Sequence, residues 1–202
     1  MIKHIWFDFS ETIGVIKRDA HNKLRYETYA GIVDKSVTPE LIEEYEKLYE
    51  QHQHSNSAVF RSLGMPAGYW SDHLSGSELH SLVDNKIPEI LEKLKEIVPI
   101  SIFSNINLDK VLPTFHIDPK LFTHILSSSM VKEPKPALEG FYKIIELSKL
   151  PPEEILYIGD HIGKDILPAK KVGLKAGLIW SSSPEADYNF KNFSEILDIF
   201  KT

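Results

Sequence analysis

Four short apolar segments in the C-terminal half of the chain each end abruptly in polar residues or in a serine-rich stretch. They are Val98–Phe103, Thr123–Leu126, Ile155–Ile158 and Ala176–Trp180. Their apolar residues are nearly continuous and do not alternate with polar ones, which is typical of strands buried on both faces of a parallel sheet. A fifth segment, Lys3–Phe7, ends at Asp8. These segments predict an α/β fold built on a parallel sheet.

Apolar residues recur at helical spacing between these segments. We expect helices from Pro136 to the residue before Pro151, over Ile166–Val172 ahead of Gly173, and over Asn192–Lys201. Alternating strands and helices are the signature of βαβ units, which connect with a right-handed crossover. The sequence therefore predicts a Rossmann-like core.

The stretch 14–85 interrupts this alternation. Thr38 and Pro39 have the residue types that cap and open a helix, and the apolar residues that follow have amphipathic spacing. The Glu-rich face of this helix is expected to be solvated. A further helix, over Ile87–Ile97, leads back into the sheet. We therefore divide the 202 residues into a core, 1–13 and 86–202, and an inserted helical subdomain, 14–85.

The composition excludes several classes of protein. The net charge is −6 and no Lys/Arg run occurs, so binding of nucleic acid or of an anionic membrane surface is not expected. No apolar stretch approaches the ~20 residues of a transmembrane helix. Asp8 lies too early for a secretory signal, and cysteine is absent. We expect a cytoplasmic protein whose chemistry uses carboxylates, hydroxyls, Lys, Arg, His and bound metal.

Polar residues follow the predicted strands at the positions where parallel sheets bind ligands. They are Asp8, Ser104 with Asn105, Lys135, and Asp160 with Asp165. Three carboxylates brought together repel one another unless a cation joins them. Oxygen ligands without cysteine favour a hard cation such as Mg²⁺. A lysine and a serine beside that metal supply the positive charge and the hydrogen-bond donor that a phosphoryl group needs.

At these residues the chain resembles the haloacid dehalogenase-like (HAD) superfamily. The family's first motif, an apolar strand ending in DxDxT, is matched by Phe7-Asp8-Phe9-Ser10-Glu11-Thr12. The second, a strand ending in Ser or Thr, is matched by Phe103-Ser104-Asn105, and the third by Lys135-Pro136. The acidic fourth motif is matched from Gly159-Asp160 to Asp165. The resemblance covers the whole chain, and the insertion resembles that family's helical cap of the first type.

The resemblance implies a role for each matching residue. Asp8 is the nucleophile and forms an aspartyl-phosphate, while Ser104 and Lys135 hold the transferring phosphoryl group with Asn105 nearby. Thr12 orders the nucleophile loop.

The resemblance also implies the metal ligands. Asp160 binds Mg²⁺ together with the Asp8 carboxylate and the backbone carbonyl of Ser10, and Asp165 supports the metal or Lys135. Arg61 is the residue of the cap that we would test first for contact with a substrate anion.

One position departs from the family's phosphatases. They carry a second Asp two residues after the nucleophile, which protonates the leaving alcohol and then activates water, and this chain has Ser10 there. The carbonyl of Ser10 preserves metal binding, but proton transfer is lost, and such transfer contributes ~10²–10⁴ in rate. Glu11 and His161 are candidate proton carriers. Adjacent side chains of an extended strand point in opposite directions, so Glu11 reaches the site only if the loop turns sharply.

Other branches of the family also lack the second Asp. The 2-haloacid dehalogenases use no metal. This chain keeps Asp160 and Asp165, an acidic pair for which a metal-free site has little use. Phosphonatases need a cap lysine in an apolar setting, which this insertion lacks, and P-type ATPases need membrane segments. The favoured function is Mg²⁺-dependent hydrolysis, at a slow rate, of a small phosphorylated metabolite. A HAD-fold protein that binds a phosphorylated ligand or a protein partner without turnover is the alternative, and 2-haloacid dehalogenation is a third option.

Overall fold

A computed structural model of the chain describes residues 1–52, 55–66, 68–74, 79–108, 111–127 and 130–201. Its centre is a six-stranded sheet in the order β5-β4-β1-β6-β7-β8, and every pair of neighbouring strands is parallel. In chain order these strands are β1 His4–Phe7, β4 Ile100–Ser104, β5 Ile125–Ser127, β6 Ile155–Gly159, β7 Lys175–Ile179 and β8 Tyr188–Phe190. The predicted parallel α/β core is therefore confirmed.

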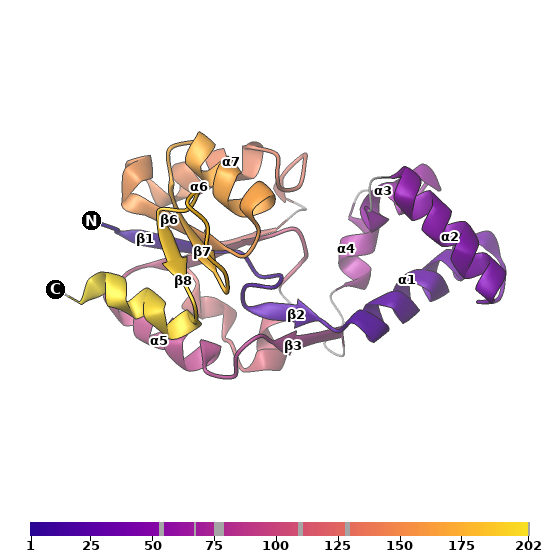
Figure 1. Cartoon of the computed structure of the whole chain (residues 1–202), viewed down its shortest axis with the longest axis horizontal. Helices are drawn as coiled ribbons and strands as arrows, with labels where there is room; N and C mark the ends of the chain where they lie inside the picture. Colours follow the sequence, from indigo (N-terminus) through magenta and orange to yellow (C-terminus); the bar gives the residue numbers. More distant parts are fainter. Residues whose placement is uncertain (53–54, 67, 75–78, 109–110, 128–129, 202) are drawn as a thin grey trace.

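Helices cover both faces of this sheet (Figure 1). One face is covered by α5, Ile87–Ile97, and by a C-terminal 3-10 helix, η7 Phe193–Phe200; the other by α6, Glu139–Ser148, and α7, Leu167–Lys171. Successive side chains of a strand point to opposite faces, so Ile5 and Phe7 pack in one apolar cluster and Trp6 in the other. Burial on both faces explains why these strands are almost continuously apolar.

Several boundaries differ from those that the sequence predicts. The helix expected from Pro136 begins at Glu139, and the helix expected from Ile166 is preceded by a turn of π-helix, η6 Ile162–Ile166. The edge strand β8 was missed because it is short and carries an exposed asparagine, Asn189, between its two partly or fully buried ends. Shorter 3-10 helices are η2 Leu112–Phe115, η3 Pro119–Leu121 and η5 Pro152–Glu154. Within the described part of the chain, no helix has the length and apolar character that crossing a bilayer requires.

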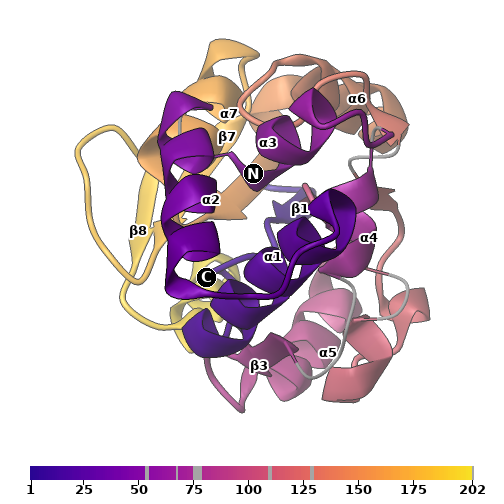
Figure 2. The same ribbon diagram turned by 90° about the vertical axis from the view of Figure 1, so that its right-hand side faces the viewer.

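The inserted segment forms a group of helices that stands away from the sheet in Figure 1 and in front of it in Figure 2. They are α1 Arg18–Val33, α2 Pro39–Gln51, α3 Asn56–Ser62 and α4 Tyr69–His73. The chain leaves and re-enters the core through an antiparallel ribbon of β2, Gly14–Ile16, and β3, His80–Leu82. The sequence pattern did not reveal this ribbon, because each strand has only three residues. The division at 13/14 and 85/86 stays a prediction.

These helices pack on one another through buried apolar side chains that belong to the same cluster as those on one face of the sheet. The rings of Phe60 and Trp70 are stacked with centroids 5.0 Å apart, and both side chains are almost fully buried. The helix predicted after Thr38 is α2, and the Thr38 hydroxyl accepts a hydrogen bond from the Leu41 N–H, as expected of a helix cap. The aromatic residues of the insertion are therefore used for packing.

Candidate active site

A polar cavity of about 270 Å³ opens at the carboxyl ends of β1, β4 and β6. Its lining consists almost entirely of charged and hydrogen-bonding side chains, namely Asp8, Ser10, Glu11, Asn105, Lys135, Asp160, His161, Lys164 and Asp165. Eight of these nine residues, all except Lys164, were candidates on sequence grounds. Because the strands are parallel, loops far apart in the sequence meet at this edge of the sheet.

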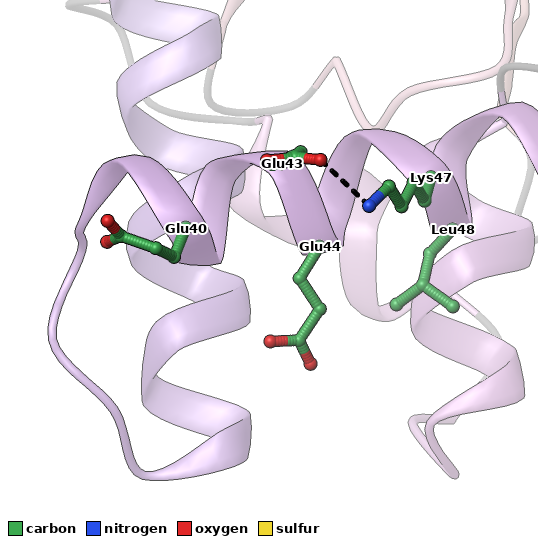
Figure 3. Close-up of a pocket in the computed structure, with 5 residues that line it drawn as sticks. All are labelled: Glu40, Glu43, Glu44, Lys47 and Leu48. Carbon is green, nitrogen blue, oxygen red and sulfur yellow. Dashed lines mark ion pairs between the residues drawn. The ribbon is translucent and has the colours of Figure 1, made fainter.

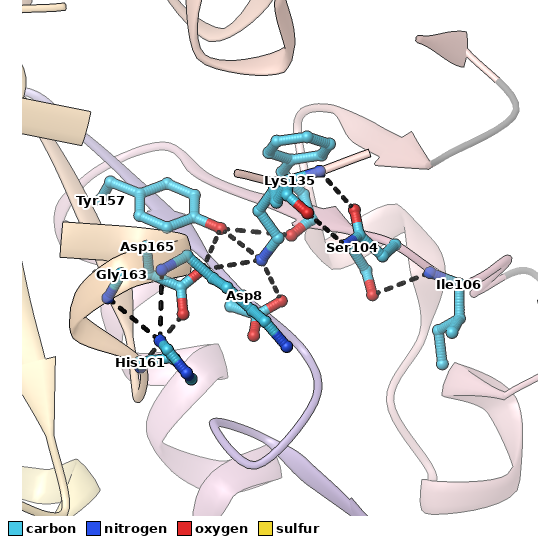
Figure 4. A network of polar contacts seen from close by, with 11 residues as sticks. Asp8, Ser104, Ile106, Lys135, Tyr157, His161, Gly163 and Asp165 are labelled. Atoms are coloured by element: carbon cyan, nitrogen blue, oxygen red, sulfur yellow. Dashed lines mark hydrogen bonds and ion pairs between the residues drawn. The ribbon is translucent and has the colours of Figure 1, made fainter. Parts of the chain in front are cut away.

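A buried lysine joins two of the carboxylates (Figure 4). The Lys135 ammonium lies 2.6 Å from Oδ1 of Asp8 and 2.8 Å from Oδ1 of Asp165. The three side chains are only 4%, 7% and 2% exposed. Asp8 directly follows β1, and its N–H donates to the carbonyl of Ile158 on β6, which fixes the carboxylate at the strand end. The result is a buried cation shared between two anions.

Burial and charge change the proton affinities of this group in opposite directions. Burial raises the pKa of Asp8 to about 7, because the opposing attraction of Lys135 is only partial and Asp165 adds repulsion. Burial alone would lower the pKa of Lys135, but the carboxylates of Asp8 and Asp165 outweigh it and raise that pKa, so the ammonium stays charged. The pKa of Asp8 is raised mainly by burial, whereas the pKa of Lys135 is raised by its two carboxylate neighbours. With an anion within 3 Å on two sides, the lysine keeps its positive charge.

Lys135 is held in place through its backbone. It lies in the loop before α6 and not directly ahead of a helix, because α6 begins at Glu139. The Asn105 side-chain amide donates to the Lys135 carbonyl at 3.2 Å, and its carbonyl oxygen accepts from the Lys135 N–H at 3.0 Å. Asn105, which the sequence placed near the phosphoryl group, therefore clamps this loop and also lines the cavity.

Sequence reasoning missed Tyr157, which contacts the same lysine. Tyr157 lies in β6 and is fully buried, and its hydroxyl oxygen accepts a hydrogen bond from the Lys135 ammonium at 2.9 Å. The available signal was a tyrosine inside an otherwise apolar strand, because a buried hydroxyl needs a polar partner.

Three carboxylates form the group best suited to a metal ion. One oxygen from each of Asp8, Asp160 and Asp165 lies within 4.8 Å of the others. Burial and then repulsion by Asp165 raise the pKa of Asp160, which directly follows β6. Carboxylates whose mutual repulsion is this strong fit a hard divalent cation, since such a cation takes oxygen ligands and offsets their charge.

Gly159, the residue before Asp160, makes room for Asp165. A Cβ atom at position 159 would lie 2.5 Å from Cγ of Asp165, well inside contact distance. The buried Asp165 carboxylate also accepts a hydrogen bond from the His161 N–H at 3.1 Å. The glycine of the Gly159-Asp160 pair is thus a steric requirement of the acidic site.

The loop after Asp8 turns sharply at Glu11. Glu11 has a φ of 58°, in the left-handed region, and its N–H donates to the Gly14 carbonyl at 2.8 Å. Ser10 and Glu11 therefore both line the cavity, although neighbouring side chains of an extended strand would diverge. Burial and the nearby Asp160 raise the pKa of the Glu11 carboxyl.

His161 lies beside Asp160 and also lines the cavity. Its Nδ1 accepts hydrogen bonds from the N–H groups of Gly163 and Lys164, at 3.0 and 3.2 Å. An Nδ1 that accepts two hydrogen bonds carries no proton, so the ring is a neutral imidazole with its hydrogen on Nε2. The imidazole thus serves to cap the turn that contains Lys164, a residue of the lining that the sequence did not single out.

Three candidates from the sequence lie outside the cavity lining. Ser104 is fully buried at the end of β4, where its Oγ accepts from the Ile106 N–H at 3.3 Å (Figure 4). Thr12 is fully buried, and its carbonyl accepts from the Trp180 indole N–H at 3.3 Å. Arg61 is exposed on α3. The eight other candidates line the cavity.

A second hollow, of about 340 Å³, lies on the surface of α2 (Figure 3). Its lining includes three glutamates, and the exposed Glu43 forms an ion pair with Lys47 one helical turn away at 2.8 Å. The Glu43 and Lys47 side chains are about two-thirds exposed, so they do not form an enclosed binding site. This agrees with the solvated helix face that the sequence predicts. Although it is larger, this hollow has no buried charge, so the site at the sheet edge is the stronger candidate.

Comparisons with known proteins find similar sequences and similar folds. Over 87 residues, 31% are identical to the glyceraldehyde 3-phosphate phosphatase of Methanocaldococcus jannaschii, and this chain spans only 38% of that enzyme's length. The matched part is 40% of this chain. The fold is similar to that of a HAD phosphatase from Thermococcus onnurineus, with a TM-score of 0.78 and 21% identity over 98% of both chains.

A 2-haloacid dehalogenase from Pseudomonas syringae pv. Tomato DC3000 has the same fold, with a TM-score of 0.70 and 18% identity over 99% of this chain and 98% of that one. At such identities the likeness concerns the fold alone. The model of one family, described as haloacid dehalogenase-like hydrolase, matches residues 7–179. This match contains Asp8, Lys135, Asp160 and Asp165, so the chain belongs to the haloacid dehalogenase-like hydrolases.

Proposed function

We propose that this hydrolase is a Mg²⁺-dependent phosphatase that transfers the phosphoryl group of a small phosphorylated metabolite to Asp8. The observation that carries the proposal is the buried arrangement of Lys135 between Asp8 and Asp165, with Asp160 completing an acidic group in one cavity. A curated relative that matches part of the chain is a phosphatase of a small phosphorylated sugar.

The charge of the cavity explains the need for a metal. Four carboxylates and two lysines line it, so its charge is −4 + 2 = −2 when all of them are ionised and His161 is neutral. A phosphate monoester is itself a dianion, and two dianions in a partly buried cavity repel each other strongly. One divalent cation reduces the lining charge from −2 to zero. Asp8, Asp160 and the carbonyl of Ser10 would hold it, and it would neutralise charge on the phosphoryl oxygens.

The chain's own residues carry the two bond-making steps. The Asp8 carboxylate attacks phosphorus, the bond to the substrate's leaving oxygen breaks, and an aspartyl-phosphate forms. Water then attacks that phosphorus, and Asp8 and inorganic phosphate are released. Lys135 supplies positive charge beside the transferring group, while Asp165 and Asn105 hold Lys135 in position. The helices α1–α4 would act as the cap of the first type and exclude water when they close over the site.

Proton transfer to the leaving oxygen is the weak step. Ser10 lacks the carboxylate that the family's phosphatases use at this position, so turnover is expected to be slow. Glu11 is the better substitute, because it turns into the cavity and has a raised pKa. His161 is disfavoured because its Nδ1 already accepts two backbone hydrogen bonds.

The charge of the cavity argues against the hypothesis that this protein is a 2-haloacid dehalogenase. A 2-haloacid is an anion and its release of halide needs neither a proton donor nor a metal, so a lining with an excess charge of −2 would repel the substrate without purpose. A protein that only binds a phosphorylated ligand is the remaining alternative, and Ser10 is the residue that favours it.

The experiment measures hydrolysis of an aryl phosphate, with and without Mg²⁺, by the wild type and by the variants Asp8→Asn, Ser10→Asp and Glu11→Gln. We expect Mg²⁺-dependent release of phosphate that Asp8→Asn abolishes and Ser10→Asp increases by about 10- to 100-fold, within the range of acid–base catalysis. Glu11→Gln should slow the wild type but have a smaller effect once Asp is present at position 10.

The controls separate the alternatives. Exposed Glu43 on α2 provides a matched substitution, Glu43→Gln, that should leave the rate unchanged. Binding of Mg²⁺ without hydrolysis by the wild type or by Ser10→Asp would favour a binding protein. Metal-independent release of chloride from a 2-chloro acid would instead establish the dehalogenase.

A further inference from the structure

The hydroxyl of Tyr157 completes the coordination of the buried Lys135 ammonium. A lysine ammonium has three N–H donors. Here they have three acceptors: Asp8 Oδ1 at 2.6 Å, Asp165 Oδ1 at 2.8 Å and the Tyr157 hydroxyl oxygen at 2.9 Å. The ammonium is thus saturated by the protein, and its orientation is fixed by one neutral and two charged partners.

Tyr157 approaches the lysine from the buried side. Lys135, Asp8 and Asp165 line the cavity, whereas Tyr157 does not. Its side chain belongs to the apolar layer under α6 and α7, where its ring packs edge-on against Phe141 with centroids 5.1 Å apart. Figure 4 shows the hydroxyl pointing from this layer towards the ammonium and Asp165. The hydroxyl therefore accepts a hydrogen bond from the ammonium N–H that would otherwise face apolar side chains.

The same hydroxyl also contacts the second carboxylate. Its own hydrogen has two acceptors within reach, Oδ1 of Asp165 at 3.3 Å and the Phe103 carbonyl at 3.5 Å. The ammonium further lies 5.4 Å from the ring centroid of Phe103, within the range of cation–π attraction. Aromatic rings attract the charge but do not orient it, so the direction of the three N–H bonds depends on the hydroxyl.

We propose that Tyr157 is a positioning residue for phosphoryl transfer, which acts by directing the Lys135 ammonium towards Asp8. The inference rests on the proposed function and adds to it a residue that never touches the substrate. Without the hydroxyl, one N–H of a buried cation has no acceptor, and the ammonium must turn or shift to find one. A shift of the ammonium away from Asp8 weakens its stabilisation of the transferring group after the substrate is bound, so kcat should suffer more than KM.

The test is Tyr157→Phe, which removes one oxygen and keeps the ring, assayed with the aryl phosphate at saturating Mg²⁺. We expect kcat to fall by about tenfold, equivalent to ~1.4 kcal/mol, and KM to change by less than about threefold. The matched control is Tyr29→Phe, which also deletes a buried tyrosine hydroxyl; that hydroxyl donates to Glu44 at 2.7 Å between α1 and α2. The control should lower thermal stability without lowering kcat.

Other results would overturn the inference. An unchanged kcat in Tyr157→Phe, with full activity of the wild type, refutes the positioning role and leaves the proposed phosphatase intact. An inactive wild type refutes the proposed function instead. If Tyr157→Phe is too unstable to assay, its effect on Tm is compared in the wild type and in Lys135→Met. A hydroxyl that acts through the lysine loses its effect in that second background, and an undiminished effect contradicts the proposal.

Discussion

Replacing Lys135 with methionine removes the cation that lies between Asp8 and Asp165. Methionine is also unbranched and flexible, so the change deletes the charge with little loss of packing. Two carboxylates, 7% and 2% exposed, then lose the partner that lay 2.6 and 2.8 Å away. The hydroxyl of Tyr157 also loses its donor.

The expected cost follows from this burial. Breaking a buried ion pair by removing one partner costs about 3–5 kcal/mol, because the remaining charge is left without compensation. For a chain of this size, each kcal/mol corresponds to about 2–4 °C in Tm, so Tm should fall by about 6–20 °C. The cost should be larger above neutral pH, since the pKa of Asp8 is already raised to about 7 by burial and rises further without the lysine.

The measurement is urea unfolding of both proteins in EDTA, at a pH above 7 and again near pH 5. Lys93→Met is the matched control, because Lys93 lies the same 2.6 Å from Glu89 but the two side chains are 55% and 65% exposed. We expect less than about 1 kcal/mol for this control. The argument from burial would be refuted if Lys135→Met lowered the free energy of unfolding as little as the control does. It would also be refuted if the loss were not smaller near pH 5 than above pH 7.

Two further predictions concern the acidic group. Gly159→Ala places a Cβ 2.5 Å from Cγ of Asp165, so the carboxylate must move. We expect this variant to lose most phosphatase activity and to have a lower Tm. The control is Gly31→Ala on α1, where a Cβ meets no atom within 4 Å, and it should have neither effect. Burial raises the pKa of Asp8 from 3.8 to about 7, so the folded state holds this proton more tightly than the unfolded state. Its stabilising contribution is complete below about pH 4 and is lost as pH rises through about 7. In EDTA, the stability of the wild type should therefore decline with pH more steeply than that of Asp8→Asn, and Mg²⁺ should reverse the decline; parallel pH profiles would contradict this.

The strands of the core were predictable because their burial is two-sided. Val98–Phe103 and Ile155–Ile158 contain few polar residues, and a parallel strand between two helical layers leaves no room for them. The start of α6 was placed three residues too early, since proline suits a first helical turn as well as the loop that contains Pro136. The strands of the β2–β3 ribbon escaped prediction because three residues are too few for a periodic pattern.

The candidate site was predictable to the extent that its residues follow strands directly. Asp8 and Asp160 come immediately after β1 and β6, so their positions behind parallel strands were enough to predict that they lie at the same edge of the sheet. Glu11 was harder, because its left-handed backbone is a property of the folded loop and not of the residue type. Thr12 and Ser104 have candidate residue types but lie outside the cavity lining, where their backbone or hydroxyl oxygens accept hydrogen bonds from Trp180 and Ile106.

By itself, the sequence determined the parallel core and the identity of the charged groups at its edge, since both depend on patterns within short segments. Only the tertiary structure decided how those groups share their charges. The Lys135 ammonium finds Asp8, Asp165 and Tyr157 on separate elements, and space for one of them depends on the missing side chain of Gly159. Hydrogen bonds and ion pairs act over about 3 Å, a distance that is set by packing in three dimensions and is not encoded in the spacing of a motif.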